Sequence, residues 1–308
     1  MHPSIYCDSF GPFRCELKPV LPIDLSAGLL LDRQLARDIG ASLSGAYQSA
    51  VPFPHIMLEN FLPEELVQGL SEHFPLGRLK SDVVFDVGYV GHHKRQILPL
   101  DCDEYCRRAF DFFNAQPFLE FLEGLSGIDG LVPDPYFVGG GFHEIGRGGK
   151  LGIHADFRIN NKLHLRRRMN VIIYLNRDWR EEYNGSLELW SRDMKHAVQR
   201  IAPLWNRCVI FNTDAQSWHG HPDPLATPDG VFRRSLALYY YTGSKAIYEE
   251  VPNRSTMYVA RPSDENAIRS EAKSLRMAQH LAGWVPPEIL RYSKAAIRRA
   301  RKLVRRQD

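Results

Sequence analysis

The sequence predicts an α+β protein whose core is an antiparallel β-barrel or jelly roll with helices beside it. Four segments between residues 169 and 241 are rich in β-branched and aromatic residues, and polar turns rather than helical patterns separate them. Between residues 103 and 125, aromatic and leucine side chains recur every three or four residues, as in helices with one buried face. With 44% hydrophobic residues, the 308-residue chain has enough apolar side chains for a sizeable core.

The cysteines and the N-terminus indicate a reduced, cytoplasmic protein. Five cysteines, at positions 7, 15, 102, 106 and 208, are odd in number, form no Cys-x-x-Cys motif and lie in a chain too long to need disulfides. The N-terminus lacks a basic region followed by a long apolar run. No segment approaches the roughly 18 apolar residues of a membrane span. We therefore expect neither secretion nor membrane insertion.

The excess of positive charge is confined to the end of the chain. Residues 286–308 hold eight Lys or Arg and two acidic residues, a balance of +6, so the net charge of +3 leaves about −3 for the remainder. This distribution argues against a nucleic-acid partner for the rest of the chain. Residues 288–306 are predicted to form a basic helix. Its basic face is either simply solvated or a surface for an acidic partner or an anionic membrane.

The first half of the chain is predicted to contain mainly helices. The expected elements are, in order, a helix over 29–39 that ends before Gly40, a strand over 52–61, a helix from 62 to about 73, an irregular strand over 83–98, and one or two helices over 103–125. Pro63, Glu64 and Glu65 support the start of the second helix, because proline fits a first helical turn and the helix dipole favours acidic residues there.

Short strands and turns follow Gly127. We expect strands over 136–138 and 142–145, separated by three glycines, and then a hairpin turn over 146–149. A phosphate-binding loop is not favoured at these glycines, because no Gly-Lys-Ser/Thr ending and no helix follow them. The four later strands are expected over 169–176, 186–190, 207–211 and 235–241, and a helix over 264–282.

Two pairs of residues have the spacing His-x-Asp: His154 with Asp156, and His221 with Asp223. The second pair has no usable partner later in the chain, because the only later histidine lies in a predicted helix. The first pair shares one face of an extended segment and has a third candidate ligand in His219 or His221. Residues two apart on a strand share a face, so periodicity does not separate these two histidines.

Two imidazoles and one carboxylate on one face of an ion suit iron(II), because three positions stay open for a bidentate co-substrate and dioxygen. The adjacent histidines His92 and His93 are a weaker metal candidate. Neighbouring side chains on a strand point to opposite faces, so these two cannot bind one ion without distortion. We interpret them as a pair in a loop.

Further motifs indicate a specific protein family. They are Pro-Phe-Pro-His at 52–55, Tyr-Leu-Asn at 174–176, Asn-Gly-Ser at 184–186 and Trp-His-Gly-His-Pro at 218–222, together with His154 and Asp156. With them, residues 52–242 resemble the prolyl-4-hydroxylase-like branch of the 2-oxoglutarate- and iron(II)-dependent oxygenases. The resemblance implies a double-stranded β-helix of the jelly-roll or cupin type, with His154, Asp156 and His219 as catalytic metal ligands.

The resemblance also implies a binding site for the distal carboxylate of 2-oxoglutarate. Arg233 and Ser235 match the family's position for it and share one face of a strand, where they can grip a carboxylate together. Arg234 points the other way and is the alternative anchor. Tyr174 matches a position whose hydroxyl reaches the same carboxylate, and Asn170, four residues earlier on that face, is a further candidate.

The implied cofactors are iron(II), 2-oxoglutarate and dioxygen, with ascorbate as a candidate reductant. The implied reaction is hydroxylation of an aliphatic C–H bond in a protein prolyl residue, a free amino acid or another small metabolite. Asp156 favours oxygen transfer over halogenation, because halogenating relatives lack this carboxylate. His143 and Glu144 stand where animal prolyl hydroxylases often carry a tyrosine, so the resemblance assigns no substrate-binding residue.

Three regions are therefore expected: an N-terminal extension over 1–50, an oxygenase domain over 51–243 with its jelly-roll core from about 134, and a helical region with a basic tail over 244–308. Two alternatives remain. One is a cupin-type metalloenzyme that does not use 2-oxoglutarate, for which Arg233 would have no purpose. The other is a non-catalytic protein that binds metal or a partner.

Overall fold

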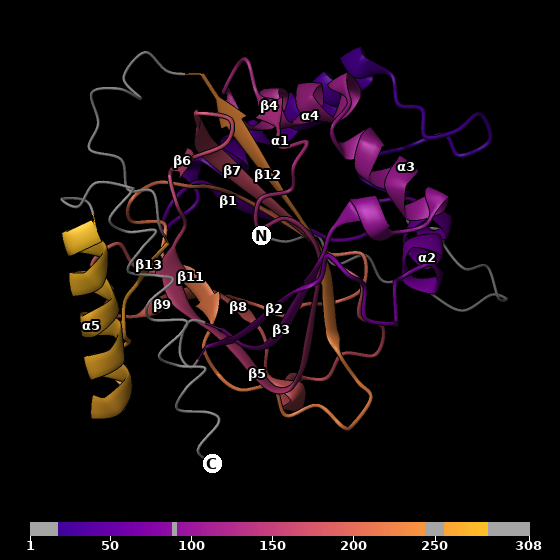
Figure 1. The fold of residues 1–308 in the computed structure, drawn as a ribbon. Coiled ribbons are helices and arrows are strands. Elements are labelled where there is room, and N and C mark those ends of the chain that lie inside the picture. The colour runs from indigo at the N-terminus through magenta and orange to yellow at the C-terminus, as the bar shows by residue number, and fades with distance from the viewer. Residues whose placement is uncertain (1–17, 88–90, 244–255, 283–308) are drawn as a thin grey trace, which may run out of the picture.

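The computed structural model describes residues 18–87, 91–243 and 256–282, and its centre is an antiparallel sheet curled into a nearly closed barrel (Figure 1). Its main path of paired strands runs β1-β10-β7-β12-β5-β11-β8-β9, with β2, β3, β4, β6 and β13 joined to it. The strands are β1 (His55–Leu58), β2 (Val83–Val87), β3 (Gly91–Ile97), β4 (Val132–Pro133), β5 (Gly141–Ala155), β6 (Ile159–Asn160), β7 (Leu165–Tyr174), β8 (Leu187–Trp190), β9 (Ala197–Ile201), β10 (Cys208–Asn212), β11 (His219–His221), β12 (Arg233–Thr242) and β13 (Met257–Tyr258). The predicted jelly-roll core is confirmed.

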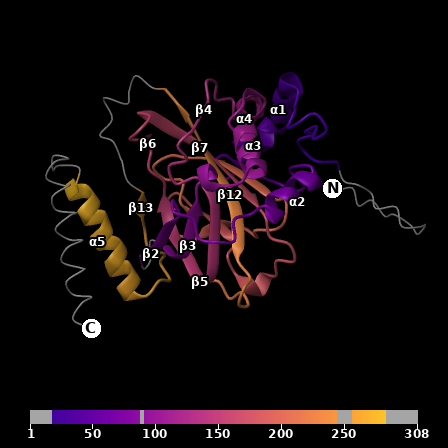
Figure 2. The same cartoon turned by 45° about the vertical axis from the view of Figure 1, so that its right-hand side comes forward.

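Most helices cover one side of the barrel. The helices are α1 (Arg33–Ser49), α2 (Glu64–Glu72), α3 (Glu104–Phe113), α4 (Gln116–Ser126) and α5 (Asn266–Ala282), with short 3-10 turns at Pro99–Asp101 and Glu181–Tyr183. Helices α1 to α4 gather on one side and α5 lies on the other, as the turned view of Figure 2 shows. Predicted helices over 62–73, 103–125 and 264–282 are confirmed.

The alternation of side chains along β7 and β12 separates a helix-facing core from the barrel interior. On β12, Leu236, Leu238 and Tyr240 join the hydrophobic cluster that the helices cover. Ser235, Ala237 and Tyr239, which alternate with these residues, line a cavity inside the barrel. Because successive strand residues point to opposite faces, one short run supplies both the core and the polar interior.

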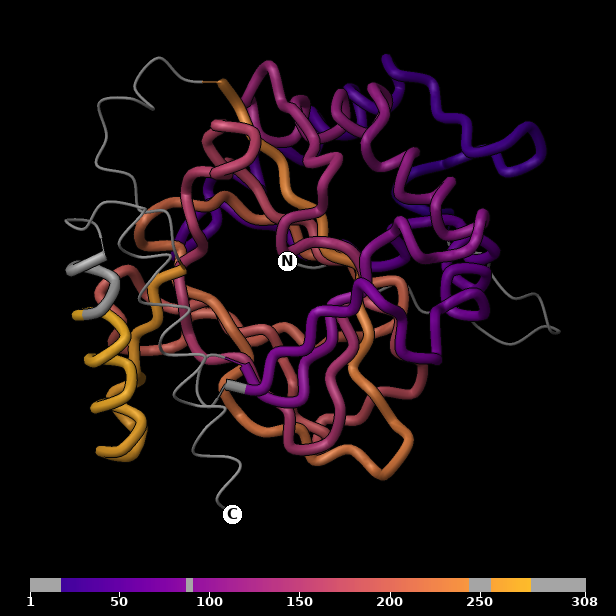
Figure 3. Tube along the Cα trace, viewed as in Figure 1, coloured from indigo at the N-terminus to yellow at the C-terminus, as the bar shows by residue number. Residues whose placement is uncertain are grey.

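Strand β5 corrects the prediction for residues 136–149. The sequence predicts a hairpin turn at the glycines of 146–149, but β5 continues through them, and residues 136–138 form a turn. The first part of β5 pairs with β12, and its last part pairs with β11. Gly148 has φ +74°, and a Cβ at Gly149 would lie 2.4 Å from Ile145. These glycines therefore bend the strand between two parts of the barrel rather than ending it. The Cα trace in Figure 3 follows this course.

Helix α1 also differs from its prediction over 29–39. It begins after Asp32, whose carboxylate accepts a hydrogen bond from the Leu35 N–H, and it runs through Gly40 to Ser49. Gly40 does not end the helix because it lies at the contact with α4. A Cβ there would be 2.1 Å from the carbonyl oxygen of Phe121. The glycine thus serves a close helix crossing rather than a helix end.

Two expectations for the chain ends fall outside the described residues: the basic helix over 288–306, and Cys7 and Cys15. Cys102, Cys106 and Cys208 are buried free thiols. Among the helices of the described ranges, none combines the length and the hydropathy that a membrane-spanning segment requires.

Gly40→Ala should destabilise the fold, whereas Gly45→Ala in the same helix should stabilise it. The added methyl at position 40 meets the backbone of α4, and such overpacking costs about 1–3 kcal/mol. Position 45 has no atom within 4 Å of a Cβ, so alanine gains about 1 kcal/mol of helix propensity. Urea unfolding measures both free energies. Equal effects of the two substitutions would contradict the close crossing.

Candidate active site

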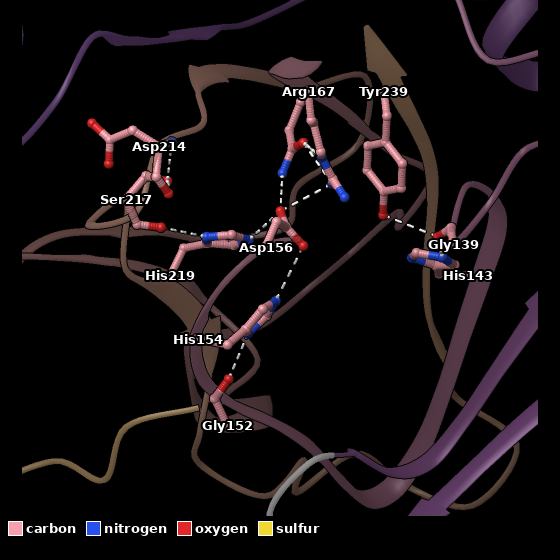
Figure 4. A network of polar contacts seen from close by, with 11 residues as sticks. Gly139, His143, Gly152, His154, Asp156, Arg167, Asp214, Ser217, His219 and Tyr239 are labelled. Carbon is pink, nitrogen blue, oxygen red and sulfur yellow. Dashed lines mark hydrogen bonds and ion pairs between the residues drawn. The ribbon is translucent and has the colours of Figure 1, made fainter. Parts of the chain in front are cut away.

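Three side chains predicted as metal ligands meet inside the barrel. His154 lies on β5, Asp156 follows the end of that strand, and His219 on β11 is in register with His154. All three are buried. Asp156 Oδ1 lies 3.8 Å from His154 Nε2, and Asp156 Oδ2 lies 3.4 Å from His219 Nε2 (Figure 4). Their potential ligand atoms all lie within 4.8 Å of one another.

The hydrogen bonds of the two imidazoles leave their Nε2 atoms available. His154 Nδ1 lies 2.8 Å from the carbonyl oxygen of Gly152, and His219 Nδ1 lies 2.9 Å from that of Ser217. A carbonyl only accepts, so each Nδ1 donates, and each Nε2 faces Asp156 and carries the lone pair in the neutral form of the ring. Burial and the neighbouring His219 lower the pKa of His154 to about 3. Neutral imidazoles in this tautomer are suited to bind a metal.

The spacings from Asp156 to the two histidines also fit an ion. Nitrogen and oxygen ligands lie about 2.1 Å from a transition metal, so two ligands of one ion lie at most about 4.2 Å apart. The distances of 3.8 Å and 3.4 Å from Asp156 to the two histidines are within this limit. The donor set of two imidazoles and one carboxylate suits non-haem iron(II).

Asp156 is held by two residues of β7. Its Oδ2 accepts a hydrogen bond from Asn170 Nδ2 at 2.8 Å and an ion pair from Arg167 Nη2 at 2.9 Å. Asn170 Oδ1 in turn accepts from Arg167 Nε at 2.9 Å and Nη2 at 2.7 Å. Burial alone would raise the pKa of Asp156, but the charge of Arg167 holds it well below its usual range. The carboxylate is therefore ionised.

Sequence reasoning missed Arg167, which stands between two other arginines at the start of β7. Its guanidinium carbon lies 3.5 Å from the ring centroid of Tyr239 and 4.7 Å from that of Phe157. The sequence alone carries no signal for it, because strand periodicity places residues three apart on opposite faces. Arg167 is three residues before Asn170, and an irregularity in the pairing of β12 with β7 lies between these rows.

The structure separates His219 from His221, which periodicity does not. A register shift lies between them on β11, so His219 is opposite His154 while His221 is opposite Leu151. His221 is buried and lines the same cavity, but it is not part of the group of three potential ligands. Neither of its ring nitrogens has a hydrogen-bond partner among the described residues.

Arg233 lines this cavity of about 300 Å³ together with the three potential ligands and Ser235. Its Nε donates to the Gly185 carbonyl oxygen at 2.8 Å, and its Nη2 donates to the Tyr174 hydroxyl at 3.2 Å. Tyr174 is fully buried in a hydrophobic cluster behind Arg233. Arg233 thus contacts the cavity directly, and Tyr174 supports it.

Arg234 and Glu144 lie on the opposite face of the sheet. Arg234 Nε donates to Glu144 Oε2 at 2.9 Å, and its guanidinium carbon lies 4.5 Å from the ring centroid of Phe74. Of the adjacent residues His143 and Glu144, only His143 lines the cavity. Burial lowers the pKa of His143 well below its usual value. The imidazole is neutral, and its Nε2 lies 2.9 Å from the Gly139 carbonyl oxygen.

The expectation that His92 and His93 point to opposite faces is wrong. Their rings are stacked with centroids 3.9 Å apart, and Asp86 pairs with His92. His93 has φ +48°, and the pairing of β3 with β5 shifts between His92 and Lys94. This distortion turns the rings to one side, and the three side chains form a second, more exposed group of potential metal ligands.

Residues 140–241 match the sequence model of the family described as the 2OG-Fe(II) oxygenase superfamily. No curated protein sequence matches the chain. Solved structures similar to it include a prolyl-4-hydroxylase from Pseudomonas putida, with 18% identity, a TM-score of 0.46, and 66% of this chain and 98% of that chain covered.

Two further similar structures carry bound molecules. One is a Trichoplax adhaerens prolyl hydroxylase in complex with a peptide of the hypoxia-inducible factor degradation domain, with 18% identity, a TM-score of 0.45 and coverage of 68% and 91%. The other is HygX from Streptomyces hygroscopicus with nickel and 2-oxoglutarate, with 10% identity, a TM-score of 0.43 and coverage of 61% and 82%. The family match includes the strands that carry His154, His219 and Arg233. Residues 140–241 therefore match the 2OG-Fe(II) oxygenase superfamily, the class of 2-oxoglutarate-dependent non-haem iron dioxygenases.

Proposed function

We propose that this protein hydroxylates an aliphatic C–H bond of a small molecule or a peptide, with iron(II) held by His154, Asp156 and His219. The observation that carries the proposal is the presence of these three side chains and Arg233 around one cavity of about 300 Å³. A prolyl residue, a free amino acid and another small metabolite are the candidate substrates.

When bound, iron(II) would activate dioxygen and couple its reduction to the oxidative decarboxylation of 2-oxoglutarate to succinate. The protein's contribution is orientation. Arg167 and Asn170 fix the carboxylate of Asp156, and the Gly152 and Ser217 carbonyls fix the tautomers of the two histidines. Such outer contacts hold ligands in place and maintain their basicity.

Arg233 is suited to bind the distal carboxylate of 2-oxoglutarate. It is a buried cation that lines the cavity, and within the described ranges no carboxylate forms an ion pair with it. Ser235 is two residues further on β12 and lines the same cavity, and the Tyr174 hydroxyl lies 3.2 Å from Arg233 Nη2. Apolar residues of the lining, including Ile172 and Leu187, would exclude water from the reacting groups.

Purified protein with iron(II), ascorbate and 2-oxoglutarate should form succinate under air, and His154→Ala should reduce this to background, because a metal ligand is lost. His196→Ala, at an exposed position outside the cavity, is the matched control. Metal binding without 2-oxoglutarate binding would favour the cupin-type alternative. Failure of the folded protein to bind metal would favour a non-catalytic role.

Arg233→Ala should raise the dissociation constant of 2-oxoglutarate for the anaerobic iron(II) form at least about 30-fold. Removing one partner of a buried charge pair costs about 2 kcal/mol or more. Arg234→Ala removes the neighbouring guanidinium on the other face of the sheet, where it pairs with Glu144, and should leave this constant nearly unchanged. Equal losses in the two variants would reject Arg233 as the anchor.

Arg167→Met should weaken metal binding about 10–100-fold, as loss of an outer contact to a metal ligand typically does. Asp156 would lose the cation that pairs with its Oδ2. Arg168→Met is the control, because Arg168 donates to Thr242 instead. Cobalt(II) affinity, followed by the absorption of the bound ion, measures the effect without turnover. Unchanged affinity in Arg167→Met would refute the positioning role.

A further inference from the structure

Lys94 faces the same cavity from the strand on the other side of β5. Both Lys94 on β3 and Arg233 on β12 are in register with Ile145 of β5. All three residues line the cavity. Neighbouring strands lie about 4.8 Å apart, so the backbones of Lys94 and Arg233 are separated by roughly 10 Å. Two cations therefore enter the cavity from one row of the sheet, on either side of Ile145.

The neighbouring row shows how arginines in this sheet are neutralised. Arg95 Nε lies 2.6 Å from Asp82 Oδ2, and Arg95 Nη1 lies 3.2 Å from Glu144 Oε1. Glu144 also pairs with Arg234. Lys94, one residue from Arg95, has no carboxylate partner in the described part of the chain. Its recorded neighbour is the ring of Phe85, with the centroid 5.3 Å from the ammonium nitrogen.

Burial lowers the pKa of Lys94 to about 8, with Asp156 acting to raise it and Arg233 and Arg167 to lower it. The side chain is still predominantly a cation at pH 7. An ammonium partly removed from water without a counter-ion is unfavourable. A ligand carrying negative charge would relieve this cost.

The charges inside the cavity do not balance around Lys94. Among the described lining residues, the cations are Lys94, Arg167 and Arg233, and the one carboxylate is that of Asp156, which pairs with Arg167. Under the proposed function, the two positive charges of iron(II) and the two negative charges of 2-oxoglutarate cancel. The distal carboxylate of 2-oxoglutarate would bind Arg233. The ammonium of Lys94 remains without an anion.

Other polar groups of the cavity lining are already engaged with backbone carbonyls. Gln96 Nε2 donates to the Gly140 carbonyl oxygen at 2.7 Å, and the Tyr239 hydroxyl donates to that of Gly139 at 3.0 Å. Both residues line the cavity. Lys94 is thus the charged donor on this wall that is available to a ligand.

We propose that Lys94 binds an anionic group of the substrate, a carboxylate or a phosphate, so that the substrate is a small acidic molecule. This inference rests on the proposed function. The size of the cavity supports it, because about 300 Å³ is at the lower end of the range for ligand pockets and is shared with 2-oxoglutarate. The anionic group would anchor the substrate on the β3 side of Ile145, across β5 from Arg233.

The test uses the full chain with its lysines converted to ¹³C-dimethyl-lysine, which keeps their charge, and loaded with zinc(II) and 2-oxoglutarate. The NMR signal of Lys94 is assigned by its absence in Lys94→Arg. Propionate and inorganic phosphate are the probes, and neutral propionamide is the matched control. We expect one or both anions to shift the Lys94 signal saturably, and the anion that binds more tightly identifies the group. Lys195, whose side chain is 77% exposed, should not respond.

Three results would overturn the proposal: no shift with either anion, an equal shift with propionamide, or a parallel shift of Lys195. Lys94→Gln provides a second measurement. If it weakens 2-oxoglutarate binding as much as Arg233→Ala, Lys94 serves the co-substrate and the proposal is wrong. Failure of the unsubstituted protein to bind 2-oxoglutarate would instead refute the proposed function, and this is measured before either probe is added.

Discussion

The buried ion pair between Asp156 and Arg167 is the contact on which the site depends. A carboxylate removed from water either finds a cation or becomes protonated, and a protonated carboxyl is a poor metal ligand. Arg167 keeps Asp156 ionised and takes one of its oxygens, while Oδ1 remains directed toward His154. The arginine is itself fixed by Asn170 and by the ring of Tyr239. The carboxylate is therefore oriented by the protein before a metal binds.

The period of the β-strands explains how one sheet holds both a charged interior and an apolar core. Rows of in-register residues alternate between the barrel interior and the helix-covered face. On the outer face, Arg95, Glu144 and Arg234 neutralise one another. On the inner face, Lys94 and Arg233 flank the apolar Ile145. A shift of one residue in the register of β3 or β12 would exchange these rows, so the register itself fixes the charge of the cavity.

The parts of the fold that local patterns encode could be predicted from sequence. The four strands predicted between residues 169 and 241 and three of the helices have apolar periods that do not depend on distant residues, and His154 and Asp156 share a face wherever their strand lies. What could not be predicted depends on partners. Gly40 resembles a helix end until α4 is packed against it, and the glycines of β5 resemble a hairpin turn until both of its neighbouring strands are known.

The same reasoning applies within the site. The shift on β11 that separates His219 from His221 exists only in the pairing with β5. Arg167 is one of three consecutive arginines, and only packing distinguishes it. The distortion at His93 likewise follows from pairing rather than from residue type. Periodicity did not distinguish His219 from His221, but family resemblance suggested His219. The resemblance carries information about strand pairing that a single strand does not contain.

One buried polar side chain that this fold leaves unsatisfied lies where ligands would bind. His221 has two buried ring nitrogens without a hydrogen-bond partner among the described residues, and it lines the cavity that Lys94 and Arg233 also line. An unpaired buried polar group costs about 1–3 kcal/mol. Ligands that satisfy these groups bind the folded state alone and therefore stabilise it by mass action. The stability cost of the unpaired His221 and the stabilisation by a ligand that pairs with it thus have the same physical origin.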